Sequence, residues 1–455
     1  MIMLGKNNMP TSPWCFLVVV LLFETGLVSS TAPDAAVEKS AANEANAGTT
    51  EIVPIMLDPA PSPIPKPEPD GTSVQTLQYV AMIVRHGDRY KDKNEFFEND
   101  PFMLEDPFWL PHGHGQLRNK GKFRMHYLGQ SLRLRYNGFI KEEYYYANIR
   151  FFSPNVDRCL MSAQLVSQGL FPPMGINIWN DNVGKFFQPI PIRSMDNSQD
   201  IWFNDGKPCP PYEKELNRIL EQKLKDINAK YQDIYEYVAY HTGRNVTNLQ
   251  HIDEIYTSLR LESENGRIMP DWTKQVFPSK LKALAGLYNQ VTYYNDKMKR
   301  IKAGPIFSEI LADLQSKTTH LVDRKLKMKV WTGYDATLLK MLHTLRFSDK
   351  YGISNIETVM LENPDQMEAW KPPANEDIME TNYGSVILFE LHYINRTYFV
   401  KVLYLDQGFS RSPKPLKLKE CDNSSLIPFD TFYNTYKKFM ITEKEWNKKC
   451  GVVMC

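Results

Sequence analysis

Two arginines flank a single histidine in the segment Arg85-His86-Gly87-Asp88-Arg89. Guanidinium groups bind phosphate oxygens through paired hydrogen bonds and keep their charge at physiological pH. A neutral imidazole can attack phosphorus and carry the phosphoryl group in a covalent intermediate. The segment therefore predicts a phosphate-binding site with a histidine nucleophile.

A second polar turn, Gly333-Tyr334-Asp335, follows the apolar run Leu326–Thr332, just as the histidine segment follows an apolar run at 76–84. Both runs have the composition of buried strands. Ligands of open α/β sheets bind beyond the carboxyl ends of the strands. We therefore expect the two turns to face each other.

Strand and helix patterns alternate on either side of a long helical stretch. Further strands are expected at Ile149–Phe152 and in a late hairpin of Val386–His392 and Tyr398–Leu405, and helices at 120–138, Val156–Leu170 and Ala336–Leu345. Residues 211–320 contain long charged amphipathic stretches, notably Tyr212–Tyr237, Leu281–Arg300 and Ile306–Ser316. The pattern predicts an α/β fold with a mostly parallel sheet flanked by helices. Its core would span about 75–205 and 320–455, with an α-helical insertion at about 206–319.

The first 74 residues have the composition of a targeting segment followed by a linker. Lys6 precedes the apolar run Trp14–Phe23, and small residues follow it, so residues 1–30 predict a secretory signal peptide. The alternative is an uncleaved anchor, but the run is short for a membrane span. Residues 31–74 are rich in Pro and Ala and predict a disordered linker. The folded domain would occupy 75–455, with no stable membrane span after signal cleavage.

Passage through the secretory pathway agrees with other features of the sequence. Three N-glycosylation sequons begin at Asn245, Asn395 and Asn423. Five cysteines remain after the predicted signal peptide, which leaves at least one unpaired within the chain. Disulfides form in this compartment. The expected location is therefore extracellular or lysosomal.

Composition and motifs exclude several classes of function. The formal net charge is +1, which argues against nucleic acid or an anionic membrane as the main partner. Neither a serine-hydrolase elbow nor a phosphate-binding loop of the nucleotide kinases occurs. The pair His112 and His114 suggests a metal site as an alternative, but no cysteine and no third histidine lies near it in the sequence. No metal and no cofactor are expected.

Several segments together resemble the histidine acid phosphatases, a group of secreted and lysosomal enzymes. The resemblance covers roughly residues 76–450 and rests on the following segments: Arg85–Arg89, Gly113–Leu117 with Gly121, Val156–Ala163, Leu170–Pro173, Cys209-Pro210 and Trp446–Cys450. It implies a phosphoglycerate-mutase-like fold and hydrolysis of phosphate monoesters. The substrate would be a small phosphomonoester or a phosphoprotein, and a homodimer is possible in this family.

The resemblance also implies roles for individual residues. His86 would be the nucleophile that forms a phosphohistidine, and Asp335 would be the general acid that protonates the leaving group. Arg85, Arg89 and Arg158 would bind the phosphate oxygens. The acid has to be protonated, and the negative charge of bound phosphate should raise the pKa of its carboxyl group.

Tyr334 occupies a position where the family has a histidine. A histidinium would give phosphate a charged hydrogen bond, whereas Tyr334 can donate only a neutral one. We therefore expect reduced turnover. The alternatives are a pseudophosphatase that binds phosphorylated ligands without turnover, and a mutase or phosphotransferase with the same phosphohistidine. A smaller departure is Tyr90-Lys91, where the family has a small residue and proline.

The same resemblance implies a disulfide between Cys209 and Cys450, because both match cysteine contexts of the family. A second pair, Cys421 and Cys455, is also expected. Cys159 would remain a buried free thiol on the helix that follows Arg158.

Overall fold

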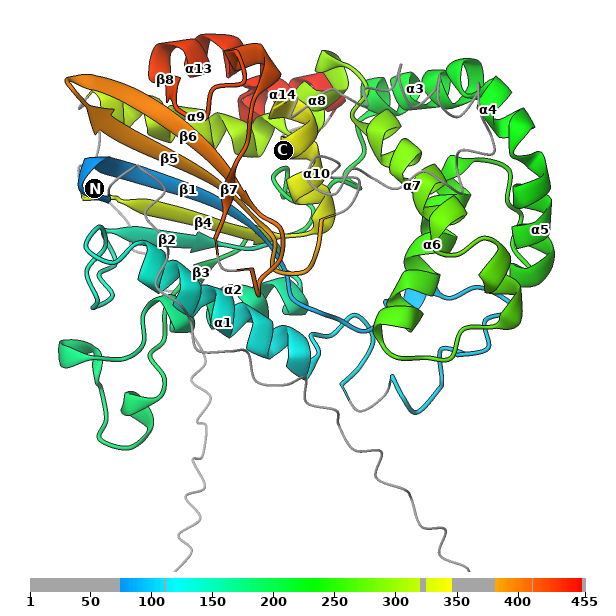
Figure 1. Ribbon diagram of the computed structural model, residues 1–455, viewed down its shortest axis with the longest axis horizontal. Coiled ribbons are helices and arrows are strands. Elements are labelled where there is room, and N and C mark those ends of the chain that lie inside the picture. The colour runs from blue at the N-terminus through cyan, green and yellow to red at the C-terminus, as the bar shows by residue number, and fades with distance from the viewer. Residues whose placement is uncertain (1–73, 110–111, 320–324, 346–380, 411, 452–455) are drawn as a thin grey trace, which may run out of the picture. The chain divides into compact units, whose positions relative to one another are not determined.

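Figure 1 shows a computed structural model of the chain, in which residues 74–109, 112–319, 325–345, 381–410 and 412–451 are described. These residues all belong to one compact unit, Leu57–Cys455. The predicted signal peptide, residues 31–73 of the predicted linker, and Cys455 lie outside the described residues. Among the described helices, none is both long enough and apolar enough to cross a bilayer.

The strands form a single mixed sheet in the order β3-β2-β4-β1-β5-β6-β7, with β8 paired to β6. The strands are β1 (Leu77–Arg85), β2 (Ile149–Phe152), β3 (Ile192–Arg193), β4 (Met328–Gly333), β5 (Val386–Ile394), β6 (Thr397–Leu405), β7 (Lys414–Pro415) and β8 (Ile427–Pro428). Strands β1 to β4 pair in parallel, but β5 runs antiparallel to both β1 and β6.

The expectation of a mostly parallel sheet is therefore wrong. The late hairpin itself is present as β5 and β6, and it turns tightly at Asn395 and Arg396, which both have positive φ. Because β5 pairs directly with β1, the hairpin extends the sheet in the antiparallel sense rather than through a helical crossover.

The central strand β1 is buried on both faces because helices cover the sheet on both sides (Figure 1). Tyr79, Ala81 and Ile83 pack into one core with α9 (Gly304–Thr319), α10 (Asp335–Leu345) and α13 (Phe429–Tyr436). The alternating residues of β1, such as Val80 and Met82, pack into a second core with α1 (Asn119–Arg135) and α2 (Asp157–Leu170). An almost continuous apolar run is the sequence that such a strand requires.

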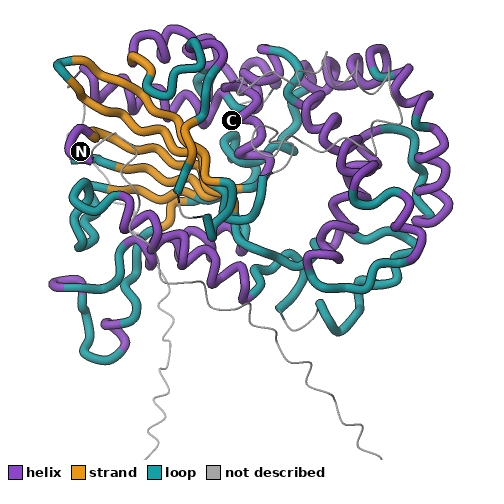
Figure 2. The backbone as a smooth tube through the Cα atoms, viewed as in Figure 1, coloured by secondary structure: helices purple, strands orange, loops and turns teal. Residues whose placement is uncertain are grey.

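The helices fall into those that cover the sheet and those of the insertion. Helices α1 (Asn119–Arg135), α2 (Asp157–Leu170), α9 (Gly304–Thr319), α10 (Asp335–Leu345) and α13 (Phe429–Tyr436) lie with the core, whereas α14 (Glu443–Cys450), at the far end of the described chain, packs with the insertion. The insertion contains α3 (Pro210–Arg218), α4 (Lys225–Lys230), α5 (Gln232–Thr242), α6 (Leu249–Glu264), α7 (Ser279–Thr292) and α8 (Asp296–Lys302). Figure 2 shows the strands gathered in the core, while the insertion consists of helices and loops.

The insertion is more finely divided than its amphipathic stretches suggest. The stretch Leu281–Arg300 is broken between α7 and α8, where the Asn295 side chain accepts hydrogen bonds from the first amides of α8 and caps it. Helix α6 was not predicted as a separate element. It starts after Asn248, whose side chain accepts a hydrogen bond of 3.2 Å from the backbone N–H of His251.

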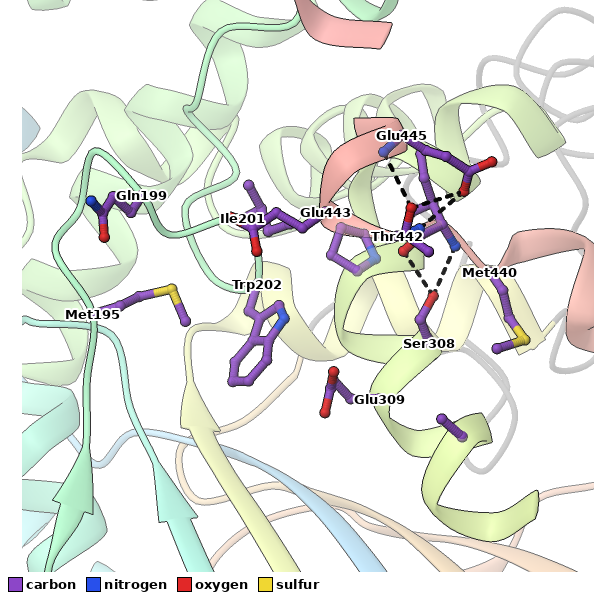
Figure 3. A pocket seen from close by; sticks show the side chains of 13 residues that line it. Met195, Gln199, Ile201, Trp202, Ser308, Glu309, Met440, Thr442, Glu443 and Glu445 are labelled. Carbon is purple, nitrogen blue, oxygen red and sulfur yellow. Dashed lines mark hydrogen bonds between the residues drawn. The ribbon is translucent and has the colours of Figure 1, made fainter. Parts of the chain in front are cut away.

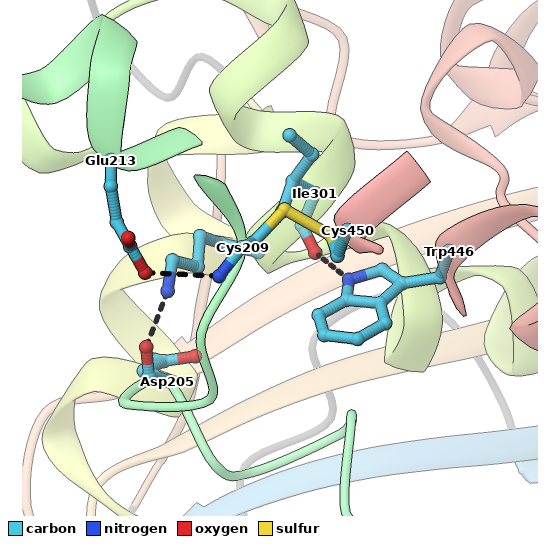
Figure 4. The surroundings of a disulfide bond; sticks show 7 residues. Asp205, Cys209, Glu213, Ile301, Trp446 and Cys450 are labelled. Atoms are coloured by element: carbon cyan, nitrogen blue, oxygen red, sulfur yellow. Dashed lines mark hydrogen bonds between the residues drawn. A yellow bond between two sulfur atoms is a disulfide. The ribbon is translucent and has the colours of Figure 1, made fainter. Parts of the chain in front are cut away.

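A disulfide joins the end of the chain to the start of the insertion (Figure 4). Cys209 and Cys450 are bonded, as expected, across a sequence separation of 241 residues. Both cysteines are buried in the apolar core of the insertion together with Trp446. The indole N–H of Trp446 donates a hydrogen bond of 3.0 Å to the backbone oxygen of Ile301. The last helix thus closes the core of the insertion.

Two other cysteines lie within the described residues. Cys421 is a buried thiol without a disulfide partner there, and Cys455, the other member of the second expected pair, lies outside the described residues, so that pair stays a prediction. The side chain of Cys421 is buried in the sheet core beside α13, where a free thiol packs as a small hydrophobic group. Cys159 is also a buried free thiol.

Candidate active site

The two polar turns lie side by side because β1 and β4 are neighbouring parallel strands. Arg85 at the end of β1 is in register with Gly333 at the end of β4. The backbone N–H of His86 donates a hydrogen bond of 2.9 Å to the Gly333 oxygen. Across the same gap, an Arg85 guanidinium nitrogen lies 2.9 Å from Oδ2 of Asp335, the first residue of α10. The proposed nucleophile and the proposed acid are therefore neighbours.

His86 is held in a form suited to nucleophilic attack. Its side chain is buried, and Nδ1 lies 2.8 Å from the backbone oxygen of Gly87. Since a carbonyl only accepts, Nδ1 carries the proton and Nε2 keeps its lone pair. Burial, followed by the charges of Arg158, Arg85 and Arg89, lowers the pKa of His86 well below its ordinary value. The imidazole is therefore neutral in mildly acidic solution.

Each of the three arginines around His86 is fixed by an anion or a carbonyl. Arg89 forms two hydrogen bonds to Glu95, of 2.5 and 2.6 Å. Arg158, from α2, lies 3.0 Å from Oδ2 of Asp92. Arg85 also donates to the backbone oxygen of Thr381.

These arginines also keep donor capacity. The buried Nε–H group of each one has no hydrogen-bond partner among the described residues. Buried donors without partners cost free energy in a folded protein. An anion such as phosphate would accept hydrogen bonds from such a cluster of three unpaired donors.

The carboxyl group of Asp335 is ionised in this arrangement. Burial would raise its pKa, but the charges of Arg85 and then Arg260 lower the pKa well below its ordinary value. The carboxylate also accepts a hydrogen bond of 2.9 Å from the backbone N–H of Ala336 at the start of α10. To act as an acid, Asp335 must therefore gain its proton when a negatively charged substrate approaches.

Tyr334 contacts two members of the site through its ring. The ring lies edge-on to His86, with the centroids 6.2 Å apart. The guanidinium carbon of Arg158 lies 5.3 Å from the centre of the same ring. Tyr334 thus supports Arg158 by a cation–π contact, which is a role that its sequence position did not predict.

Close backbone contacts explain the glycines around the histidine. A Cβ atom on Gly121 of α1 would lie 2.3 Å from the Asp88 oxygen, and one on Gly87 would lie 2.7 Å from the Gly121 oxygen. Arg124 of the same helix forms a buried ion pair with Asp88, with atoms 2.6 Å apart. The histidine segment is therefore packed directly on α1, which limits its movement.

Other residues in contact with the site were missed by the sequence reasoning. Tyr383 follows the segment 346–380, and its ring lies 5.8 Å from His86 and 4.4 Å from the guanidinium carbon of Arg85. Arg260 belongs to α6 and lies 3.9 Å from Oδ2 of Asp335. The other missed residues are Asp92, Glu95 and Thr381. The two acids could have been noticed because they follow the histidine segment within ten residues, but no local pattern marks Tyr383 or Arg260.

The two histidines considered for a metal face different aromatic rings. His112 stacks on Tyr90 at 5.7 Å, and His114 meets Phe96 edge-on at 5.5 Å. Within the described part of the chain, no group of three or more His, Cys, Asp or Glu residues is arranged to hold a metal.

A separate pocket of about 420 Å³ lies elsewhere in the core (Figure 3). Its wall includes Trp202 from the loop before α3, Ser308 and Glu309 of α9, and Thr442 at the start of α14. None of the residues around His86 lines it. This pocket is therefore not the phosphate site.

The comparison with known proteins agrees with this geometry. Residues 76–405 match the family described as histidine phosphatase superfamily (branch 2). The chain belongs to this superfamily. It is 30% identical to the venom acid phosphatase Acph-1 of Apis mellifera over 353 residues, which cover 76% of this chain and 81% of that protein. It is 28% identical to the prostatic acid phosphatase of Bos taurus over 388 residues, covering 84% and 89% of the two chains.

A likeness to solved structures extends the agreement to the fold. The structure of the Hafnia alvei phytase in complex with myo-inositol hexakis sulphate matches with a TM-score of 0.57 and 14% identity. The match covers 81% of this chain and 98% of the phytase. The α/β fold with a central sheet flanked by helices is therefore that of the histidine phosphatases.

Proposed function

We propose that this chain is an acid phosphatase that hydrolyses phosphate monoesters through a phosphohistidine on His86. The observation that carries the proposal is the buried, neutral imidazole with Nε2 unprotonated, surrounded by Arg85, Arg89 and Arg158. Membership of the superfamily and the likeness to acid phosphatases support the same activity.

In the first step, the lone pair of His86 Nε2 attacks phosphorus while the ester P–O bond breaks. The proton of Asp335 passes to the leaving oxygen, so that an alcohol departs rather than an alkoxide. The three arginines hold the non-bridging oxygens and stabilise the negative charge in the transition state. The product of this step is a phosphohistidine with Asp335 ionised.

In the second step, water attacks the phosphohistidine. Asp335 accepts a proton from the water as its oxygen bonds to phosphorus, and the P–N bond breaks. Phosphate leaves, and His86 returns to its neutral form. Asp335 thus alternates between acid and base, which suits its place directly opposite the histidine.

The arrangement is suited to acidic solution. Because the pKa of His86 is lowered, the nucleophile stays neutral at mildly acidic pH. Because the pKa of Asp335 is low, its carboxylate stays ionised until the charge of the substrate, or a lower pH, restores the proton that the acid has to donate. Together they favour turnover at acidic rather than neutral pH.

The second part of the proposal is that Tyr334 reduces the rate of turnover. Its ring contacts His86 and Arg158, and it supplies no positive charge to the phosphate. A loss of one charged donor can cost on the order of a hundredfold in rate. The alternative is a protein on the same fold that binds phosphorylated ligands with almost no turnover.

Hydrolysis of phenyl phosphate between pH 4 and 7.5 distinguishes these functions. We expect measurable release of phosphate by the wild type, increasing toward acidic pH, and none above background by His86→Ala. If both proteins are equally inert but bind phosphate, the non-catalytic alternative is correct.

A further inference from the structure

One cation of the site comes from the insertion rather than from the α/β core. Arg260 lies one turn before the end of α6, and its guanidinium nitrogen is 3.9 Å from Oδ2 of Asp335. Arg85 contacts the same carboxylate oxygen at 2.9 Å. Asp335 is thus held between an arginine of the phosphate cluster and an arginine of the insertion.

The end of α6 is fixed against the segment that follows the histidine. Glu262 forms an ion pair of 2.5 Å with Lys91, and both side chains are buried. Asn265 donates to the backbone oxygen of Arg89 at 3.4 Å, and Arg118 donates to the backbone oxygen of Glu264 at 2.9 Å. These contacts hold the helix end in one position, so Arg260 keeps a defined place beside Asp335.

The position of Arg260 determines which part of a substrate it can meet. A general acid must lie within hydrogen-bond distance of the leaving oxygen. Any leaving group in contact with Asp335 therefore passes close to Arg260. The Arg260 side chain is only 15% exposed, so an ion pair formed there is partly shielded from solvent.

Protonation of Asp335 changes the charge balance around Arg260. With the carboxyl group neutral, Glu264 is still an acidic neighbour of Arg260, but it lies 3.8 Å from the Arg260 Nε and is 38% exposed. An anionic group on the substrate can replace the lost charge of Asp335. A neutral leaving group cannot.

We propose that Arg260 selects phosphomonoesters whose leaving group carries a negative charge, such as a carboxylate or a second phosphate. This inference rests on the proposed phosphatase function and adds a substrate class to it. Arg260 is then a specificity residue that binds the leaving group, whereas the three arginines around His86 bind the transferred phosphate.

A matched pair of substrates tests the proposal. 4-Carboxyphenyl phosphate and 4-carbamoylphenyl phosphate have similar shapes, but only the first has a charged leaving group. We expect the wild type to favour the carboxylate by about tenfold in kcat/KM, since charged hydrogen bonds are the stronger ones. The preference should shrink with added salt.

Variants assign the preference to Arg260. Arg260→Gln should lose the preference, so that its kcat/KM values for the carboxylate and the carboxamide become equal, while Arg260→Lys should keep part of the preference. Arg244→Gln removes a charge elsewhere on the insertion, where Arg244 pairs with Glu254, and should keep the full preference. Circular dichroism and thermal unfolding establish that each variant is folded.

The possible failures are distinguishable. A wild type that hydrolyses neither substrate contradicts the phosphatase function itself. A wild type that hydrolyses both at equal rates, or an Arg260→Gln variant that loses both activities equally, overturns the role of Arg260 in leaving-group selection and leaves the phosphatase function standing.

Discussion

At the scale of residues, the site combines a neutral nucleophile with three fixed cations. Arg89 and Arg158 are held by Glu95 and Asp92, so the loss of side-chain freedom occurs during folding rather than on substrate binding. His86 contributes no positive charge before the reaction. The positive charge available to the phosphate therefore comes from arginines, which bind it without losing protons.

The substitution Tyr334→His tests how far Tyr334 lowers kcat. A histidinium at this place would add a charged donor to the phosphate site, so we expect kcat for phenyl phosphate to rise severalfold. Tyr334→Phe keeps the ring that contacts Arg158 and should stay close to wild type. Turnover that falls in Tyr334→His but not in Tyr334→Phe would mean that support of Arg158 by the ring matters more than the missing charge.

The sequence predicted the residues of the cluster but not all of their partners. His86 and the arginines near it are contiguous or lie in a distinctive segment, and the strand order brings Asp335 to them. Arg260 and Tyr383 could not be found in this way. They reach the site from a helix and a segment far away in the chain, and neither has a local pattern that distinguishes it from an ordinary surface or core residue.

At the scale of elements, α1 and the two central strands fix the histidine segment. The contact between Gly121 and Asp88 brings the helix backbone against the segment itself. Strand β4 supplies the acceptor for the backbone N–H of His86. The position of the nucleophile thus depends on three elements that are distant in sequence.

The variant Gly121→Ala tests this packing. Alanine favours helix formation over glycine by about 1 kcal/mol, but the new Cβ would lie 2.3 Å from the Asp88 oxygen. We expect the clash to prevail, with a net loss of about 1–3 kcal/mol in unfolding free energy and a lower kcat. Chemical denaturation and phenyl phosphate hydrolysis measure the two effects. The exposed substitution Lys120→Ala in the same helix is the control and should change neither.

The buried ion pair between the insertion and the core gives stability a pH dependence. Burial raises the pKa of Glu262 from its ordinary 4.5 to about 7, although Lys91 lowers it. Between pH 4.5 and 7 the folded protein therefore binds more protons than the unfolded chain, and its stability falls as the pH rises. The contribution is of the order of a few kcal/mol across this range.

Thermal unfolding of Glu262→Gln at pH 5 and pH 7.5 tests this dependence. Between pH 5 and pH 7.5, the melting temperature of the wild type should fall more than that of the variant, because the variant has no carboxyl group at position 262 to titrate. Glu254→Gln, on the same helix but exposed, should behave as the wild type. Equal pH dependence in all three proteins would mean that Glu262 does not titrate in this range.

At the scale of the whole molecule, contacts at several places join the insertion to the core, and two of them bear directly on stability. The contacts of the α6 end form one, and the disulfide that joins Cys209 to Cys450 forms the other. The segment between the two cysteines includes the insertion and most of the sheet, so the bond restricts the unfolded chain strongly.

Replacement of both cysteines by serine should destabilise the protein by about 2–5 kcal/mol. Thermal unfolding under non-reducing conditions measures the loss. Cys159→Ser serves as the control, since that thiol forms no bond. An unchanged melting temperature in the double variant would show that packing of α14 alone closes the insertion.

The fold was predictable in its order of elements but not in all of its pairing. Apolar runs at 76–84 and 326–332 predicted two strands whose following turns face each other, and the structure pairs β1 and β4 directly and in parallel. The antiparallel half was missed because sequence patterns show that a hairpin exists without showing which strand it joins. The break between α7 and α8 was missed because the amphipathic pattern of Leu281–Arg300 continues through a short capped break.

Trapping of the phosphoenzyme tests the central claim most directly. The protein is mixed with phenyl phosphate, quenched in alkali, where phosphohistidine survives, and mapped by mass spectrometry. We predict phosphate on His86 in the wild type, and neither phosphoenzyme nor turnover in His86→Ala. Phosphate on any other residue, or hydrolysis that persists in His86→Ala, would contradict His86 as the nucleophile.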